Sequence, residues 1–360
     1  MVLGLVISAG FLVYAFQGQQ PGEIWAALRR VDGRWIAPAL VFYFVGVWLR
    51  AVRWSVLLRP LVAVSARSIW PVVVVGYTAN NVLPLRMGEL VRSYLLGRRY
   101  GVRKTAALAT IAVERLFDGL TMLAFMLAAT TVISFTAELQ RLALIAFVLF
   151  VAILLGLMVL TLGGDLRDRL LQLVLGPLPT PVADRVERMA ASFLGGLGVL
   201  TRKGDLLLVA TLSLGAWGCE ASMYWLVAQG FGLPLTAAVG PAGALLTTGV
   251  ANLATLVPAA PGYVGTFEAG VLLAVNGALG VPRSLALSYA ILVHAALWFP
   301  VTLWGAIEWW RQHLSLAQAR REATVGDGEE SAAMTMSRAE ANVAPQPERR
   351  QASTTGRGSG

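Results

Sequence analysis

The sequence has 360 residues, of which 57% are hydrophobic and 14% are charged, and its mean hydropathy is +0.67. A soluble domain of this length does not have such a composition, so we expect a membrane protein with several spans. The net charge of +9 predicts contact with anionic lipid headgroups and not with nucleic acid, since the sequence contains no compact basic segment with interleaved aromatic residues.

Six apolar stretches are long enough, or nearly so, to cross a hydrocarbon core of about 30 Å. They are residues 2–16, 35–58, 104–133, 142–162, 206–227 and 285–309. Two more apolar stretches, 69–83 and 235–257, are rich in Gly, Pro, Asn and Thr and end in turns that contain proline, which is typical of broken or re-entrant helices. The sequence therefore predicts an all-α integral membrane protein, a polytopic helical bundle with two re-entrant helical hairpins.

Basic residues are distributed unevenly among the predicted loops, and loops rich in Lys and Arg remain on the cytoplasmic side. Most of the 29 Lys and Arg residues fall in loops 50–67, 86–104 and 164–204 and in the tail after Trp310. The opposite side holds only Arg29, Arg30, Arg34, Arg141 and Arg283. This distribution predicts a multi-pass protein of the cytoplasmic membrane with both termini in the cytoplasm.

Residues 311–360 are polar and poor in aromatic residues, so they cannot bury enough apolar surface to fold. We expect a transmembrane domain over residues 1–310, followed by a disordered cytoplasmic tail. In the loop 164–204, apolar residues at helical spacing, among them Val182 and Met189, predict an amphipathic helix at the membrane surface.

A short pattern occurs twice in the chain. Asn80 is followed by a proline and then by Glu89, and Asn252 is followed by a proline and then by Glu268; each glutamate lies twelve residues before a Gly-Val pair. The two copies lie near residues 76–133 and 249–309. Because three predicted crossings separate them, the second copy should be inverted relative to the first. Inverted repeats with broken helices are common in transporters, where two similar halves open a central site alternately to either side.

Polar and charged residues follow the first broken stretch: Asn80, Asn81, Arg86, Glu89 and Arg92. The two arginines could bind a lipid phosphate, since a guanidinium group offers two parallel donors. The alternative is that these charges only anchor a helix end at the interface. The nearby asparagines and turn residues favour a binding role. The predicted turn residues of both copies are Pro84, Gly88, Pro261, Gly262 and Gly265.

Glu114, Arg115 and Asp118 lie inside one predicted span. Glu114 and Asp118 share a helix face at i,i+4, and Arg115 and Asp118 are i,i+3 neighbours. Ionisable groups at this depth are costly in lipid and often mark a pathway or a binding site. The alternative is an internal ion pair that fixes this helix to a neighbour.

Glu268 follows the second glycine-rich turn, where Thr266 could cap the next helix. If the repeat is real, Glu89 and Glu268 are symmetry mates, and one of them could attract a cationic headgroup or carry a coupling proton. Glu268 could also serve only as a partner of the helix dipole. Glu220 has two interpretations, a functional acid or a buried hydrogen-bonding group. For His294, a hydrogen-bonded packing role is favoured over a metal ligand or a proton relay.

Taken together, three motifs resemble the lysylphosphatidylglycerol synthase transmembrane-region (flippase-like) family over roughly residues 5–310. The motifs are Asn80-Asn81-Val-Leu-Pro-Leu-Arg86-Met-Gly88-Glu89-x-x-Arg92, Glu114-Arg115-Leu-Phe-Asp118 and Pro261-Gly-Tyr-Val-Gly265-Thr-Phe-Glu268. The resemblance implies a lipid-translocating membrane domain. The roughly fifty polar residues after Trp310 cannot hold the aminoacyl-transferase domain of the bifunctional synthase, so this chain departs from it there and lipid aminoacylation is not expected.

The predicted function is therefore a flippase that moves a phospholipid or lipid-linked headgroup through a polar groove lined by the two hairpins, with no cofactor. One alternative is a membrane-embedded lipid-modifying or glycosyl-transferring enzyme, although no Asp-x-Asp site, phosphate-binding glycine loop or nucleotide-binding βαβ unit is found. Another is a scaffold for a cell-envelope glycosyltransferase. That scaffold would tolerate substitution of Glu89, Arg115 and Glu268, whereas a flippase would not.

Overall fold

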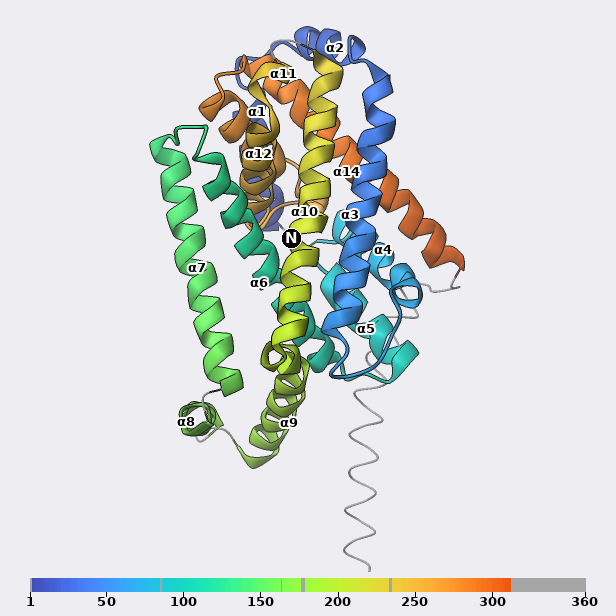
Figure 1. The fold of residues 1–360 in the computed structure, drawn as a ribbon, viewed down its shortest axis with the longest axis vertical. Helices are drawn as coiled ribbons and strands as arrows, with labels where there is room; N and C mark the ends of the chain where they lie inside the picture. The colour runs from blue at the N-terminus through green and yellow to red at the C-terminus, as the bar shows by residue number, and fades with distance from the viewer. Residues whose placement is uncertain (1, 85, 163, 176–178, 233–234, 312–360) are drawn as a thin grey trace, which may run out of the picture. The chain divides into compact units, whose positions relative to one another are not determined.

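The computed structural model describes residues 2–84, 86–162, 164–175, 179–232 and 235–311, and every regular element in these ranges is helical (Figure 1). The helices are α1 (Val2–Phe16), α2 (Pro21–Arg29), η1 (Gly33–Trp35), α3 (Ile36–Leu57), α4 (Ala66–Val82), α5 (Gly88–Tyr100), α6 (Lys104–Ala129), α7 (Ala137–Leu162), α8 (Gly164–Leu175), α9 (Thr180–Gly196), η2 (Leu197–Thr201), α10 (Lys203–Phe231), α11 (Leu235–Ala238), α12 (Pro241–Ala254), η3 (Pro261–Tyr263), α13 (Thr266–Leu272), η4 (Leu273–Ala278) and α14 (Arg283–Arg311).

The prediction of a helical membrane protein is confirmed. In the described part of the chain, four helical segments are long and apolar enough to cross a membrane: Gly33–Leu57, Ala137–Thr161, Lys203–Phe231 and Arg283–Arg311. Helix α1 is apolar but shorter. Helix α6 has 26 residues, or about 39 Å at 1.5 Å per residue, which is long enough to span, but it carries several charges. The six crossings expected from sequence are these four helices with α1 and α6, and for these last two the crossing stays a prediction.

Helices α3 and α10 pack against each other along their lengths and run in opposite directions (Figure 1). At one end, the amide of Asp32 donates to the carbonyl of Gly230 at 2.8 Å. At the other end, Arg59 forms an ion pair with Asp205. Gly46 lets the two backbones approach, because a Cβ there would lie 2.9 Å from the carbonyl oxygen of Ala216. These contacts join the two helices at both ends and between them.

Helices α4 and α5 form a helix pair with a tight turn. Helix α4 begins at the cap of Ser65, whose hydroxyl accepts from the amide of Ser68 at 3.2 Å, and it ends before Pro84, which disfavours helical backbone at the preceding residue. The Asn80 side chain accepts from the amide of Gly88 at 2.7 Å and so ties the end of α4 to the start of α5. A side chain at Gly88 would overlap the backbone of α4.

Helices α12 and α13 form a second helix pair, joined by the short helix η3. Gly265 is the N-cap of helix α13, and its amide donates to Glu268 Oε2 at 2.6 Å. The expectation that Thr266 caps this helix is wrong, because Thr266 is already the first helical residue and its hydroxyl donates to the carbonyl of Tyr263 at 3.0 Å. Helix α13 continues into the π-helix η4, an irregularity often found at functional sites.

Each of the two helix pairs packs against a long helix. Helix α4 lies against α14, helix α12 lies against α6, and η3 contacts α4. Thr78 donates to backbone carbonyls of α14, and Gly249 lies against Met126 of α6. The turn after α4 and the turn before α13 consequently meet in the middle of the bundle. Whether these pairs are re-entrant, and whether they are related by inversion, stays a prediction.

The sequence also made predictions for the loop 164–204 and for the tail. In the loop 164–204, a helix does form where the apolar spacing predicted one, namely α9, and α8 is an additional helix. The side chains of Val182 and Met189 are exposed, and α9 packs on α6 through Gly196; a position at the membrane surface stays a prediction. Apart from Arg311, the predicted tail 311–360 lies outside the described residues.

Candidate functional site: a charged cavity between the two helix turns

A cavity of about 430 Å³ lies where the two turns meet. The charged and titratable side chains that line it are Arg50, Arg86, Glu89, Arg115, Asp118, Glu220, His294, Tyr43, Tyr77 and Tyr263, and its polar side chains include Asn80, Asn81 and Asn252. Part of the wall is apolar and includes Leu149 and Ile153 of α7. Those two side chains are 45% and 38% exposed, so the cavity has an apolar side at the surface of the bundle.

At the rim of this cavity, three charges form a loose group. Arg115 lies 3.1 Å from Glu89 Oε1 and 3.1 Å from Asp118 Oδ2, while Arg86 lies 3.7 Å from Glu89 Oε1. The side chains of Arg86 and Arg115 are 32% and 30% exposed, and that of Glu89 is 16% exposed. We call Arg86, Glu89 and Arg115 the rim group. Its two guanidinium groups share the Glu89 carboxylate, and Arg115 also pairs with Asp118. Each guanidinium group has five N–H donors, more than these ion pairs use.

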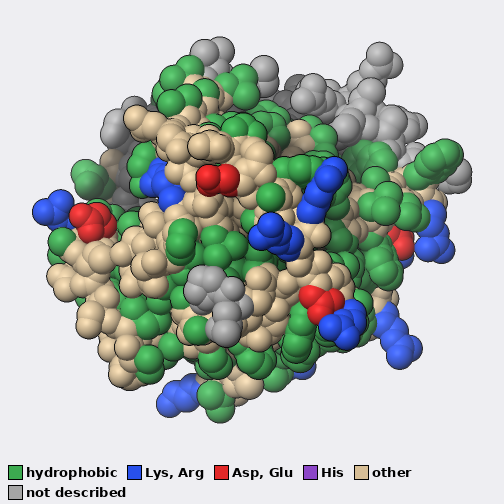
Figure 2. All heavy atoms as spheres, turned by 90° about the horizontal axis from the view of Figure 1, so that it is seen from above, with side chains coloured by type: hydrophobic (Ala, Val, Ile, Leu, Met, Phe, Trp, Pro, Cys, Tyr) green, Lys and Arg blue, Asp and Glu red, His purple; other side chains and the backbone are tan. Residues whose placement is uncertain are grey.

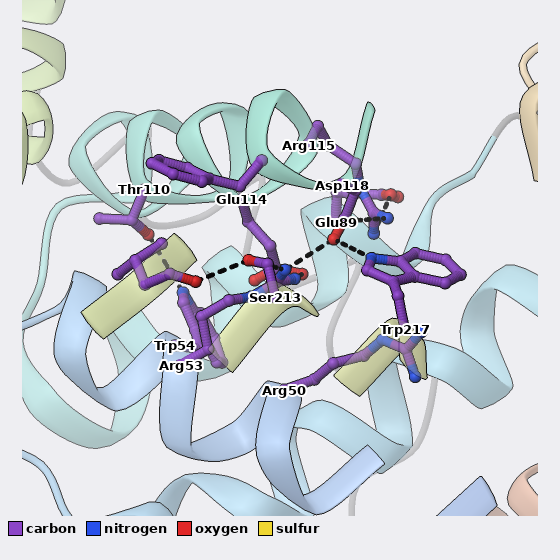
Figure 3. Close-up of polar contacts among 12 residues, drawn as sticks. Arg50, Arg53, Trp54, Glu89, Thr110, Glu114, Arg115, Asp118, Ser213 and Trp217 are labelled. Carbon is purple, nitrogen blue, oxygen red and sulfur yellow. Dashed lines mark hydrogen bonds and ion pairs between the residues drawn. The ribbon is translucent and has the colours of Figure 1, made fainter. Parts of the chain in front are cut away.

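Behind the rim lies a group of buried charged side chains, and Figure 3 shows the contacts of Arg53, Glu114 and Asp118 among them. Arg92 and Glu114 form a bidentate pair at 3.0 and 2.8 Å, and the Arg92 guanidinium stacks on Trp54 at 4.0 Å. Arg53 donates to Asp118 Oδ1 at 2.7 Å and lies 3.5 Å from Glu114. We call Arg53, Arg92 and Glu114 the sealed layer; Arg53 and Arg92 are 0% and 4% exposed, and Glu114 is 1% exposed. This layer matches the alternative in which ion pairs fix α6 to its neighbours.

A third pair joins the two central helices. Arg50 of α3 donates to Glu220 of α10 at 2.6 Å, and its guanidinium lies 4.2 Å from the ring of Trp217. Trp217 donates from its indole nitrogen to Asp118 Oδ1 at 2.8 Å, as Figure 3 shows. Asn252 donates to the other oxygen of Glu220 at 3.2 Å. Both Glu220 oxygens therefore have partners, and the pair lies on the cavity wall.

On the opposite wall, Glu268 and His294 are linked directly. His294 Nδ1 lies 2.5 Å from Glu268 Oε1, and His294 Nε2 lies 2.8 Å from the carbonyl oxygen of Gly262. The His294 ring also packs on Phe267, with ring centroids 4.6 Å apart. His294 thus connects α14 to α13 and to the turn that precedes it.

The two turns contact each other across the cavity. The Arg86 guanidinium lies 5.3 Å from the ring of Tyr263. In the described residues, these two are the non-glycine residues with positive φ, 53° and 62°, a conformation that is strained for a side chain with a Cβ. Gly262 has φ 72° and lies against Trp298 and the carbonyl oxygen of Asn81. Strained backbone on both sides of one cavity is typical of a functional site.

The structure brings most of the predicted site residues to this cavity, but not all of them. Asn80, Asn81, Arg86, Glu89, Arg115, Asp118 and Gly262 line it. Arg92, predicted to bind phosphate, and Glu114 lie behind the wall and neutralise each other. Glu268 reaches the cavity through His294. Asn81 also donates to Thr302 at 2.7 Å.

Sequence reasoning missed Arg50 and Arg53. It assigned both to a loop, whereas they lie inside α3 and are 5% and 0% exposed. Their position at the end of an apolar stretch could have indicated them, because an unpaired charge there is costly and is usually paired with another group. Tyr77 was missed as well. Within the described residues, no group of three or more His, Cys, Asp and Glu side chains could hold a metal ion.

Residues 1–305 match the model of the family described as the lysylphosphatidylglycerol synthase TM region. A UPF0104 membrane protein of Methanothermobacter thermautotrophicus is 26% identical over 322 residues, which cover 85% of this chain and 92% of that protein. The glycosyltransferase AglD of Haloferax volcanii is 25% identical over 324 residues, which cover 82% of this chain and 51% of that protein.

A third relative, the UPF0104 membrane protein MJ1078 of Methanocaldococcus jannaschii, is 24% identical over 63% of this chain and 91% of its own length. No solved structure matches the chain at a significant level. The family model covers most of the length and confirms the resemblance of the three motifs. This chain belongs to the lysylphosphatidylglycerol synthase TM region family.

Proposed function

We propose that this chain moves a lipid with a phosphate-bearing headgroup between the two leaflets of a membrane, with the headgroup passing through the charged cavity. The observation that carries this proposal is the rim group, in which Arg86 and Arg115 face the cavity and share the carboxylate of Glu89, while Arg115 also pairs with Asp118. A guanidinium group with free donors binds a phosphate diester in the geometry that it uses for a carboxylate.

The charges in and behind the cavity favour an anionic headgroup. The arginines are Arg50, Arg53, Arg86, Arg92 and Arg115, and the carboxylates that pair with them are Glu89, Glu114, Asp118 and Glu220. In this described network the arginines outnumber the carboxylates by one. An uncompensated charge inside a membrane protein is costly, so one anion bound at the rim would be stabilising.

The apolar side of the cavity gives the acyl chains a place. Leu149 and Ile153 line the cavity and are also exposed at the surface of the bundle, where hydrocarbon would surround them. A phospholipid could then keep its chains in the bilayer while its headgroup enters the polar interior. A soluble anion has no apolar part that could contact this apolar side of the cavity.

An inverted repeat would allow this cavity to open to either side. Helices α3 to α6 form one half in this proposal, and helices α10 to α14 form the other. The observed packing supports it: α3 lies along α10, α4 lies against α14 and α12 lies against α6. If α3 corresponds to α10, α4 to α12 and α6 to α14, exchanging the two halves turns the α4–α14 contact into the α12–α6 contact and leaves the α3–α10 contact as it is. A two-fold axis in the membrane plane requires this symmetry of contacts.

We propose further that the protein lies in the cytoplasmic membrane with both termini in the cytoplasm. Three basic residues assigned to loops from sequence, Arg50, Arg53 and Arg92, are buried and do not count toward orientation. Exposed basic residues remain concentrated at the end of the bundle where α3 ends and α10 begins: Arg59, Arg67, Arg98, Arg99, Arg103, Lys104, Arg202 and Lys203. On the described part of the opposite end, charged side chains are scattered among hydrophobic ones (Figure 2).

The direct test is leaflet exchange of fluorescent anionic, zwitterionic and lysyl-bearing phospholipids in proteoliposomes. We expect exchange with the wild-type protein and its loss with Arg115→Ala. Arg59→Ala is the matched control, since Arg59 is a half-exposed arginine whose partner, Asp205, lies outside the cavity. Absence of exchange for every lipid class, or full exchange with Arg115→Ala, would contradict the proposal.

An enzyme is the second candidate function, because one relative is named a glycosyltransferase. The matched region covers 51% of that protein, so its name describes a chain about twice the length of the match. An embedded enzyme would convert a lipid in the same vesicles, and mass spectrometry of the lipids after incubation with glycosyl donors would detect the product. A scaffold for such an enzyme would instead tolerate substitution at Glu89 and Arg115.

A further inference from the structure

The Glu268–His294 pair has a hydrogen-bonding pattern that requires an additional proton. A carbonyl oxygen can only accept, so His294 Nε2 must carry the hydrogen that faces Gly262 at 2.8 Å. A neutral imidazole then has no hydrogen on Nδ1, yet Nδ1 lies 2.5 Å from Glu268 Oε1. Two lone pairs would face each other there unless a proton lies between them.

The second oxygen of Glu268 does not relieve this requirement. Glu268 Oε2 already accepts from the amide of Gly265 at 2.6 Å, so this oxygen also behaves as an acceptor. The pair therefore holds one proton beyond those of a neutral imidazole and an ionised carboxylate. The proton is on His294 Nδ1 or on Glu268 Oε1, and in both cases the pair as a whole is neutral.

We propose that the Glu268–His294 pair is a proton-binding site of the transport cycle, at which one proton is bound together with an anionic headgroup. This inference rests on the proposed function and adds the coupling ion. His294 lines the cavity and its side chain is 12% exposed, so cavity water can deliver and remove the proton. The Glu268 side chain is 7% exposed and lies behind it.

Two effects link the proton to the headgroup. When the proton leaves to cavity water, the pair acquires a net negative charge on the same cavity that holds the rim group, and this charge repels an anion. Binding of an anion must then favour binding of the proton, because coupling between two sites is reciprocal. Proton and anion together carry no net charge, which lowers the cost of crossing the bilayer.

The second effect is on the turn. A neutral imidazole can donate from only one nitrogen, so loss of the proton deprives either Glu268 or the carbonyl of Gly262 of its donor. Gly262 adjoins Tyr263, whose ring lies beneath the Arg86 guanidinium. Tyr263 has a positive φ of 62°, which is strained for a residue with a Cβ, so the turn is held in a conformation that it leaves easily once a bond is lost. Deprotonation thus loosens the turn that contacts Arg86.

The groups around the pair are compatible with a single titrating proton. Helix α10 contributes Glu220 and Tyr224, and Glu220 is already neutralised by Arg50 of α3. The remaining titratable groups on this part of the cavity are Tyr43 of α3, Tyr77 of α4, Tyr263 of η3 and Arg86 of the first turn, while Tyr289 lies on α14 itself. In the described parts of α1 and α12, which also pack on α13, no acid or base faces the pair.

The experiment uses proteoliposomes with a fluorescent anionic phospholipid in one leaflet, a pH gradient of one unit that is acidic on the labelled side, and a pH dye inside. With one proton per lipid, the wild-type protein should drive the label toward about a tenfold excess in the opposite leaflet, with a matching pH change. Glu268→Gln keeps both bonds without a titrating proton, since its amide donates to Nδ1 and its carbonyl accepts from Gly265. It should equilibrate the label without accumulating it.

The chain has two histidines, so His313→Gln is the matched control and should behave as the wild type. Accumulation by Glu268→Gln, or equal distribution by the wild type with and without the gradient, would overturn the coupling while leaving translocation intact. Absence of any exchange would instead overturn the proposed function and the coupling with it.

The proton-binding site itself is tested without transport. The ¹⁵N spectrum of the imidazole in His313→Gln protein should show a protonated Nε2, together with a proton on Nδ1 or on the carboxyl group at neutral pH. A neutral His294 with a bare Nε2 beside an ionised carboxylate would overturn the site.

Discussion

The sealed layer and the rim group are two charged regions only one helix turn apart, yet they differ in what they can do. In the sealed layer, Arg92 and Glu114 form a bidentate pair at 2.8 to 3.0 Å, and both side chains are almost completely buried. At the rim, Arg86 is 3.7 Å from its carboxylate and a third of its side chain is exposed. Ion pairs that are closed off from the cavity hold helices together, whereas charges that are partly exposed and open to the cavity can bind a ligand.

Adjacent residues of α6 separate these two roles. Glu114 faces the sealed layer and Arg115 faces the cavity. Successive residues of an α-helix point about 100° apart, so two neighbours in the sequence belong to different environments. Substitutions at these two positions should accordingly affect different properties, stability in one case and transport in the other.

The largest loss of stability is expected from Glu114→Ala. It leaves Arg92 and part of Arg53 as buried cations without their carboxylate, which costs about 3–5 kcal/mol of unfolding free energy. Thermal unfolding in detergent, together with the yield of folded protein, measures this loss. The double substitution of Arg92→Met with Glu114→Leu removes both charges and should regain most of it. If the double variant is less stable than Glu114→Ala, the loss of stability in Glu114→Ala does not come from the unpaired charge of Arg92.

Gly88→Ala is expected to have the next largest effect. A methyl group at this position overlaps the carbonyl of Gly76 and the side chain of Asn80, so the turn between α4 and α5 must open. We expect a loss of about 1–3 kcal/mol, with lipid exchange reduced as well, since the rim group lies at this turn. Gly18→Ala is a control for the loss of a glycine, because no atom lies near its Cβ position, although its positive φ adds some strain.

Arg86→Gly is expected to change stability and lipid exchange in opposite directions. It removes a guanidinium group of the rim, and we expect lipid exchange to fall about tenfold, the equivalent of about 1.4 kcal/mol in the barrier. It also relieves a residue at φ 53°, so stability should rise by up to about 1 kcal/mol. Exchange assays on one preparation test the expected fall in lipid exchange, and thermal unfolding of the same preparation tests the expected rise in stability. Loss of both stability and exchange would place Arg86 among the structural charges.

The smallest effect is expected from Arg59→Ala. Arg59 is 48% exposed and pairs with Asp205 at the end of the α3–α10 pair. An exposed ion pair contributes about 0–1 kcal/mol, so unfolding and lipid exchange should both stay near wild-type values. A large loss of exchange in this variant would indicate that charge at the membrane surface, and not the cavity, governs the rate.

Several features of this protein could be predicted from sequence alone. Apolar stretches of membrane-spanning length established the helical membrane class, and the Gly, Pro and Asn residues around Pro84 and Pro261 marked the two places where helices break. Ionisable residues in apolar surroundings, such as Arg115 and Asp118, pointed to the cavity. These inferences depend on local properties, namely hydropathy, backbone preference and the cost of a charge in lipid.

The pairing of the charges was decided only by the tertiary structure. Arg53 meets Asp118, Arg50 meets Glu220 and Glu268 meets His294, and each pair joins helices that are far apart along the chain. Helical periodicity indicates which face a residue occupies but not which helix covers that face. Arg92 and Arg86 are therefore similar in sequence context, and only the packing of Trp54 and Glu114 against one of them encloses it, while the other remains at a cavity.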